Sequence, residues 1–147
     1  MSDHAESKGT RAARAERDET RTAYDFAVLR VVPHVHLGTF VPVGVMVHAR
    51  RTGYLAMRVV TDPDELRARV PGIRDAELLA RYLRSCEAVC AGDAEGGGPI
   101  ALAPSSERFH WLTAPRSDVI QSGPVHEGVC DDPARALEEL YEEYVGA

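Results

Sequence analysis

The segment between residues 108 and 129, RFHWLTAPRSDVIQSGPVHEGV, concentrates hydrogen-bonding side chains around the only tryptophan of the chain. It includes Arg108, Arg116, Gln121 and His126. Arginine presents a planar fork of N–H donors that fits a carboxylate or a phosphate, and it is also common in interface ion pairs. Histidine titrates near neutral pH and can act as an acid or a base. These residue types indicate a ligand site or a protein interface, although a structural network tying loops to a sheet would use the same side chains.

The interface interpretation is our leading hypothesis, because tryptophan and arginine are the residue types most enriched in binding hot spots. It describes a noncatalytic interaction module that binds a protein partner, or a small anionic group that a partner presents. The binding residues that we assign to this segment are Arg108, Trp111, Arg116, Ser117, Gln121 and His126.

An enzyme acting on a phosphorylated or nucleotide substrate is the alternative. Arg108 and Arg116 would then clamp the anion, and His126 would be the catalytic acid or base. The sequence offers no convincing second acid/base group and no metal set to assist His126. We therefore rank this hypothesis below the interaction module.

Neither a metal nor a cofactor is expected. Cys86 and Cys90 continue a leucine stripe in the middle of a predicted helix, where free cysteine packs as a small apolar residue. A structural zinc site also needs a fourth ligand nearby, and the sequence shows none beside these cysteines. His34 and His36 have no evident third ligand. The chain contains neither a phosphate-binding P-loop motif nor the G-x-S-x-G motif of serine hydrolases.

The overall charge and hydropathy indicate a protein of the cytoplasm. The net charge of −6 argues against broad binding to a nucleic-acid backbone. No apolar run approaches the roughly 18–20 residues that a membrane span requires. The first residues lack the apolar core of a secretion signal, so we expect reduced cysteines and a cytoplasmic location.

The hydrophobic pattern divides the chain into a disordered tail, residues 1–21, and a single domain, residues 22–147. The tail has almost no large apolar side chains, so it cannot offset its ordering entropy. Alternating and continuous apolar runs then predict strands over 24–32, 40–50 and 54–60, joined as an antiparallel meander. Pro42 and Gly44 in the second strand suggest an edge, a bulge or a close backbone approach.

Helical patterns follow the meander, and the whole order is that of an α+β domain. Cap residues and apolar spacing predict three helices. The first begins with Thr61 or Asp62 as cap and Pro63 in the first turn, the second is a longer helix over about 75–91, and the last is capped by Asp132. We expect a flexible loop over 92–99. The remaining predicted elements are a short helix within 104–113, capped by Ser105 or Ser106, and two short strands over 117–123 and 124–129.

With these residues in view, the chain resembles the bacterial domain-of-unknown-function family 3037 from about Tyr24 to Val145. The first part resembles the pattern Y…R-x-V-P…G-E-F-x-N-V-G-V, and the second resembles R-F-x-W-L-x-A-P-R-S-T-x-I-Q-x-S-P-V-H-x-G. Four positions depart from these patterns, namely Thr39, Pro42, Asp118 and Gly123. The matching residues are Tyr24, Arg30, Pro33, Gly38, Phe40, Val43, Gly44 and Val45, then Arg108, Phe109, Trp111, Arg116, Ser117, Gln121, Pro124, His126 and Gly128.

The resemblance implies a small cytoplasmic bacterial protein with no established activity. It further implies a partner, because such proteins are expected beside a gene for a small kinase-like protein of the toxin–antitoxin type. Arg30, from the first part of the pattern, joins the candidate binding residues. If the acidic residue replaced by Thr39 and the asparagine replaced by Pro42 belong to a polar site, this chain has lost part of it.

Overall fold

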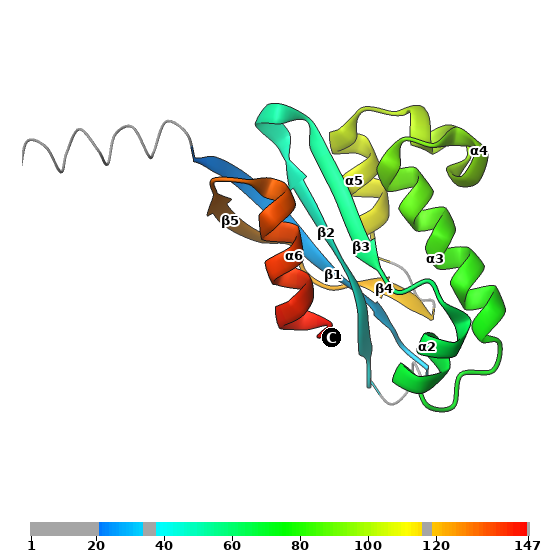
Figure 1. Ribbon diagram of the computed structural model, residues 1–147. Coiled ribbons are helices and arrows are strands. Elements are labelled where there is room, and N and C mark those ends of the chain that lie inside the picture. Colours follow the sequence, from blue (N-terminus) through cyan, green and yellow to red (C-terminus); the bar gives the residue numbers. More distant parts are fainter. Residues whose placement is uncertain (1–20, 34–37, 116–118, 147) are drawn as a thin grey trace, which may run out of the picture.

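The computed structural model describes residues 21–33, 38–115 and 119–146, which form a five-stranded antiparallel sheet with helices on both faces (Figure 1). β1 (Thr22–Val31), β2 (Val41–Ala49) and β3 (Tyr54–Val59) are the predicted meander. β4 (Ile120–Ser122) and β5 (His126–Cys130) both pair with the other side of β1, which is therefore the central strand. The α+β prediction is confirmed. The predicted tail lies outside the described residues, apart from Arg21.

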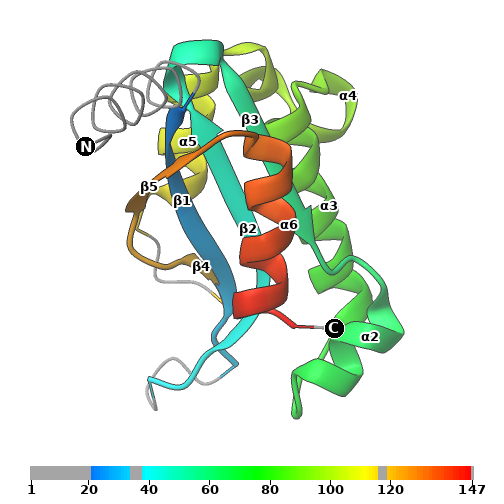
Figure 2. The ribbon, with the colours of Figure 1, turned by 60° about the vertical axis from the view of Figure 1, so that its left-hand side comes forward.

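Helices cover the two faces unequally (Figure 2). On one face, α2 (Pro63–Arg69), α3 (Ala76–Ala91) and α5 (Ser105–Thr113) pack in the larger core cluster, which includes Ala27, Leu29 and Val31 of β1. On the other face, α6 (Pro133–Tyr144) packs in a cluster with Phe26. Because successive side chains of a strand point to opposite faces, β1 supplies both cores. β2 is buried on both faces, which explains its nearly continuous apolar sequence.

Aspartates begin the helices where the sequence predicts them. Side-chain oxygens of Asp62, Asp75 and Asp132 accept hydrogen bonds from backbone N–H groups in the first turns of α2, α3 and α6. Pro63 and Pro133 open two of these helices, at positions whose N–H would have no partner inside the helix. Among the described helices, none is long and apolar enough to cross a lipid bilayer.

The predicted flexible loop after α3 is wrong. The segment instead forms α4 (Ala94–Gly97) and the 3-10 turn η3 (Pro99–Leu102), both of which contact α3. Asp93 caps the first of these turns by accepting from the Glu95 N–H. A Cβ atom at Gly97 would lie 2.8 Å from the Val89 backbone nitrogen. Glycine is therefore required here for close packing rather than for flexibility.

The short helix α5 is confirmed, but its predicted serine cap is wrong. Pro104 occupies the N-cap position, and no side chain caps the helix. The Ser105 hydroxyl is instead hydrogen-bonded to His48 Nε2 of β2, at 3.2 Å. The Ser105 hydroxyl, which the local sequence assigns to the helix cap, thus forms a tertiary hydrogen bond instead.

The irregularity suggested by Pro42 and Gly44 is present where β2 faces the end of β1. The register shifts between Leu29 and Arg30, so that Leu29 faces Gly44 and Arg30 faces Pro42. A Cβ atom at Gly44 would lie 2.9 Å from the Val59 side chain, which confirms a close approach to β3. The shift in register therefore places Pro42, rather than Val43, opposite Arg30.

Candidate functional site

The described candidate residues divide between the two faces of the sheet. In β1, Arg30 pairs with Gln121 of β4, and Phe26 pairs with His126 of β5. Paired residues share a face, as do residues four apart on one strand. Arg30, Gln121 and His126 therefore lie on the face that also carries α6. Arg108, in contrast, belongs to α5 on the opposite face.

Two of the candidates, Arg116 and Ser117, lie outside the described residues. Trp111 is on α5 and is 38% exposed, whereas Phe109 and Leu112 of the same helix are buried in the core. The opening segment of 22 residues thus contributes to both faces of the sheet instead of forming one compact surface.

Arg108 binds main-chain carbonyl groups at the end of α3. Its Nη1 donates to the Cys90 carbonyl at 2.6 Å and to the Val89 carbonyl at 3.3 Å, and its Nε donates to the Ala103 carbonyl at 2.9 Å. The last carbonyl groups of a helix have no partners inside the helix, so a guanidinium group satisfies them well. These contacts support a structural role for Arg108, one of the interpretations that the sequence left open.

Arg30 occupies a different environment. Its guanidinium carbon lies 4.4 Å from the centre of the Phe40 ring, and Phe40 is itself 51% exposed. A Cβ atom at Gly123 would lie 3.6 Å from Arg30 Nη1, so the guanidinium group passes close to this glycine. The Arg30 Nε is buried and has no hydrogen-bond partner. Within the described ranges, no carboxylate lies at ion-pair distance from Arg30.

His126 is exposed and joins an aromatic cluster between β5 and α6. Its ring centre lies 5.1 Å from that of Phe26, which in turn lies 5.8 Å from Tyr144. Tyr24 extends the cluster from the start of β1 and lies over Gly128, where a Cβ atom would come within 2.5 Å of the ring. Burial raises the pKa of Tyr24, and the nearby Cys130 raises it further.

A buried histidine that the sequence analysis missed lies on the opposite face. His48 is 2% exposed, is hydrogen-bonded to Ser105, and packs with its ring centre 5.1 Å from that of Phe109. Burial lowers the pKa of His48; Arg50 and Arg108 lower it further, whereas the facing Asp25 opposes the shift. The available signal was a histidine inside the apolar run VPVGVMVHA.

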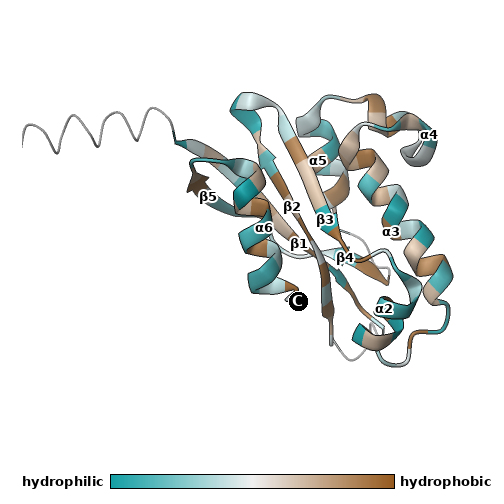
Figure 3. Cartoon of the chain, in the orientation of Figure 1, coloured by the Kyte–Doolittle hydropathy of each residue, from teal (hydrophilic) through white to brown (hydrophobic). Residues whose placement is uncertain are grey.

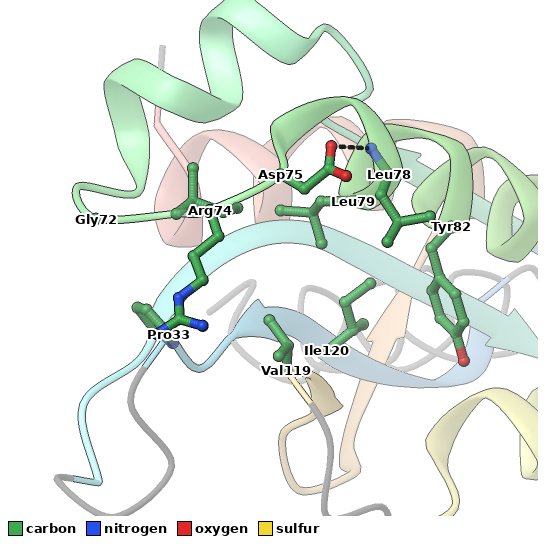
Figure 4. A pocket seen from close by; sticks show the side chains of 10 residues that line it. Pro33, Gly72, Arg74, Asp75, Leu78, Leu79, Tyr82, Val119 and Ile120 are labelled. Atoms are coloured by element: carbon green, nitrogen blue, oxygen red, sulfur yellow. Dashed lines mark hydrogen bonds between the residues drawn. The ribbon is translucent and has the colours of Figure 1, made fainter.

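A cavity of about 490 Å³, also missed, opens where α3 begins (Figure 4). It lies between the segment before α3, the first turns of that helix, and the strand ends of β1 and β4. No local sequence pattern indicates this cavity, because its walls come from three separate parts of the chain. Most of its lining side chains are apolar, including Pro33, Ile73, Leu78, Leu79, Val119 and Ile120.

Comparison with protein-family models identifies the family of this chain. A family model described as "Protein of unknown function (DUF3037)" matches residues 26–145. The chain belongs to this family. Searches of curated proteins and of solved structures found no match.

Three departures of this DUF3037 protein from the motif noted above bear on Arg30. Pro42 is its register partner on β2, Gly123 lies against its guanidinium group, and Thr39 precedes Phe40. The family resemblance implies an asparagine, a serine and an acidic residue at these positions, all of which have side-chain oxygens that can accept from arginine. Pro42 and Gly123 of this chain have no polar side chain. That is consistent with the unpartnered Arg30 Nε.

The cysteines of the DUF3037 protein pack as predicted for Cys86 and Cys90, which are buried in the larger core cluster. Burial raises the pKa of Cys90 to about 12, so its thiol stays protonated. Cys130 on β5 is partly exposed. Over the described ranges, no group of three or more His, Cys, Asp or Glu side chains is arranged to hold a metal ion.

Proposed function

We propose that this protein is a noncatalytic binding module. Its open sheet face around Arg30, Gln121 and His126 would bind an anionic group presented by a protein partner. The observation that supports this most strongly is the state of Arg30. The guanidinium group is held over Phe40, its Nε is buried without a partner, and no described carboxylate neutralises it.

An arginine held in this way suits recognition of a carboxylate or phosphate. The aromatic stack limits the orientations of the guanidinium group, so less conformational entropy is lost when an anion binds. Because the Arg30 Nε is buried, an incoming anion would be held by the terminal nitrogens of the guanidinium group.

The same face also offers apolar contact area next to the charge. Phe40, under the Arg30 guanidinium group, is 51% exposed, and Tyr144, which contacts Phe26 beside His126, is 39% exposed. A central arginine with neighbouring aromatic and apolar side chains is the usual composition of a protein-binding hot spot. The face therefore fits a protein surface that presents an acidic or phosphorylated side chain.

The enzyme hypothesis receives less support from the same geometry. It requires Arg108 and His126 to act on one substrate, but these residues lie on opposite faces of the sheet. Arg108 also donates to three carbonyl groups, so its guanidinium group is already engaged. The binding proposal does not require Arg108 and His126 to lie side by side.

The kinase-like protein implied by the family resemblance is the first partner to test. The two proteins would be co-expressed, and binding would be measured by calorimetry with wild type, Arg30→Gln and His126→Ala. We expect Arg30→Gln to weaken binding by about tenfold or more, because a charge-assisted hydrogen bond is lost. His126→Ala should weaken it less.

Arg51→Gln is the matched control, since Arg51 is an exposed arginine in the turn η2 (Arg50–Thr52). It should bind like wild type, and all variants should melt at similar temperatures. Equal affinity of Arg30→Gln and wild type for the partner would rule out the Arg30 face as the binding surface.

A further inference from the structure

The cavity at the start of α3 has the size and lining of a small-molecule site. Its volume of about 490 Å³ falls within the range of roughly 300–1,000 Å³ typical of ligand pockets. Its rim exposes apolar side chains that the fold does not cover. Leu78 is 55% exposed, and Val119 is 41% exposed. Covering these surfaces would remove apolar area from water and so favour ligand binding.

The hydropathy-coloured view shows apolar residues along α3 next to the sheet (Figure 3). On the cavity side these include Leu78 and Leu79, and Ile120 of β4 faces them (Figure 4). Leu79 and Ile120 also belong to the larger core cluster. The floor of the cavity is therefore part of the packed core, whereas its rim is exposed to solvent. A ligand with an apolar body would contact both.

One cation lies at the mouth of this apolar space. Arg74 extends toward Pro33, whereas the neighbouring Asp75 carboxylate turns toward α3 and accepts from the Leu78 N–H at 3.0 Å (Figure 4). In the part of the chain that the structure describes, no carboxylate lies at ion-pair distance from Arg74. An apolar cavity with an uncompensated arginine at its mouth is complementary to an amphipathic anion.

We propose that this cavity binds a small amphipathic monocarboxylate, with its carboxylate on Arg74 and its apolar body against Leu78, Leu79 and Ile120. A single negative charge is favoured over two because Asp75 also lines the cavity and would repel a dianion. This site lies on the α3 face, so it is independent of the binding surface proposed around Arg30.

Octanoate is a suitable probe, because it joins one carboxylate to a flexible apolar chain. Its binding to the purified full chain would be measured by calorimetry and by the shift in melting temperature. Acetate provides the charge without the apolar chain, and octanamide provides the chain without the charge. We expect octanoate to bind and to raise the melting temperature, and both controls to have much smaller effects.

Variants then locate the site. Arg74→Gln should weaken octanoate binding by about tenfold or more, since it removes the charge-assisted hydrogen bond. Leu78→Glu should also weaken binding, because it places a second carboxylate on the apolar rim. Arg81→Gln is the matched control, because Arg81 is an exposed arginine of the same helix that does not line the cavity. It should bind octanoate like wild type.

Arg74, Leu78 and Arg81 are exposed, so all three variants should fold, and melting curves without octanoate would verify this. The proposal is overturned if octanoate does not bind the wild-type chain, or if octanamide binds equally well. It is also overturned if Arg74→Gln and Arg81→Gln retain the same affinity for octanoate.

Discussion

Two arginines of this protein occupy very different surroundings. Arg108 donates to three main-chain carbonyl groups and joins α5 to the end of α3. Arg30 stacks on an exposed ring and keeps a buried N–H without a partner. Both residues suit an anion by chemistry alone. Only their surroundings separate a structural arginine from a candidate binding residue.

Arg108→Ala should lower the free energy of unfolding by about 2–3 kcal/mol, because it leaves carbonyl groups near the end of α3 without their charged donor. Urea denaturation would measure this loss. Arg81→Ala, an exposed arginine on α3, should change stability by less than about 0.5 kcal/mol. Similar stabilities for Arg108→Ala and wild type would contradict the structural role.

His48 should make stability depend on pH. Its pKa in the folded protein is lowered, chiefly by burial, from an ordinary value of 6.5. The unfolded chain therefore binds a proton more readily than the folded chain. The stabilising contribution is fully present above about pH 6.5 and is lost as pH falls toward the lowered folded-state value.

Denaturant titrations between neutral and mildly acidic pH would test this dependence. His48→Gln should unfold with a weaker pH dependence below pH 6.5 than wild type. Identical profiles for His48→Gln and wild type would show that His48 is not the responsible group.

At the scale of elements, helix starts follow local chemistry closely. Asp132 caps α6 as predicted, and Asp62, one of the two predicted caps, caps α2. Asp75 caps α3 at the predicted start of that helix, since capping needs only a short side chain and a neighbouring N–H. The segment after α3 did not follow its local signal. Its glycines suggested a flexible linker, but they permit close packing against Val89, and sequence alone does not distinguish these uses.

Asp132→Ala should destabilise the protein by about 1 kcal/mol, because the first turn of α6 loses the acceptor for the Ala134 N–H. Asp131→Ala is a closely matched control, since it removes the adjacent exposed carboxylate and leaves the cap intact. Thermal and urea unfolding would compare the two variants. Equal effects would indicate that charge, rather than capping, determines the result.

At the scale of the whole molecule, the central position of β1 decides which side chains meet. β1 pairs with β2 on one side and with both β4 and β5 on the other, so residues more than 90 positions apart become neighbours, such as Arg30 and Gln121. The two faces then acquire different helices. The segment between residues 108 and 129 is divided between them, which the sequence analysis did not anticipate.

The sequence by itself determined the features that depend on neighbouring residues. Alternation of apolar residues predicted the meander, apolar spacing predicted α3 and α6, and the leucine stripe placed Cys86 and Cys90 in the core. The motif also predicted the family, to which the chain belongs. These signals are local in the chain or follow a short period, so one sequence is enough to detect them.

Only the tertiary structure decided the surroundings of the chemically important side chains. It brought Ser105 to His48, Arg108 to the end of α3, and Arg30 to Phe40. It also assembled the cavity beside Arg74 from distant segments. The physical reason is that strand register and helix packing depend on the apolar surface buried by the whole domain. No single segment of the sequence determines that burial.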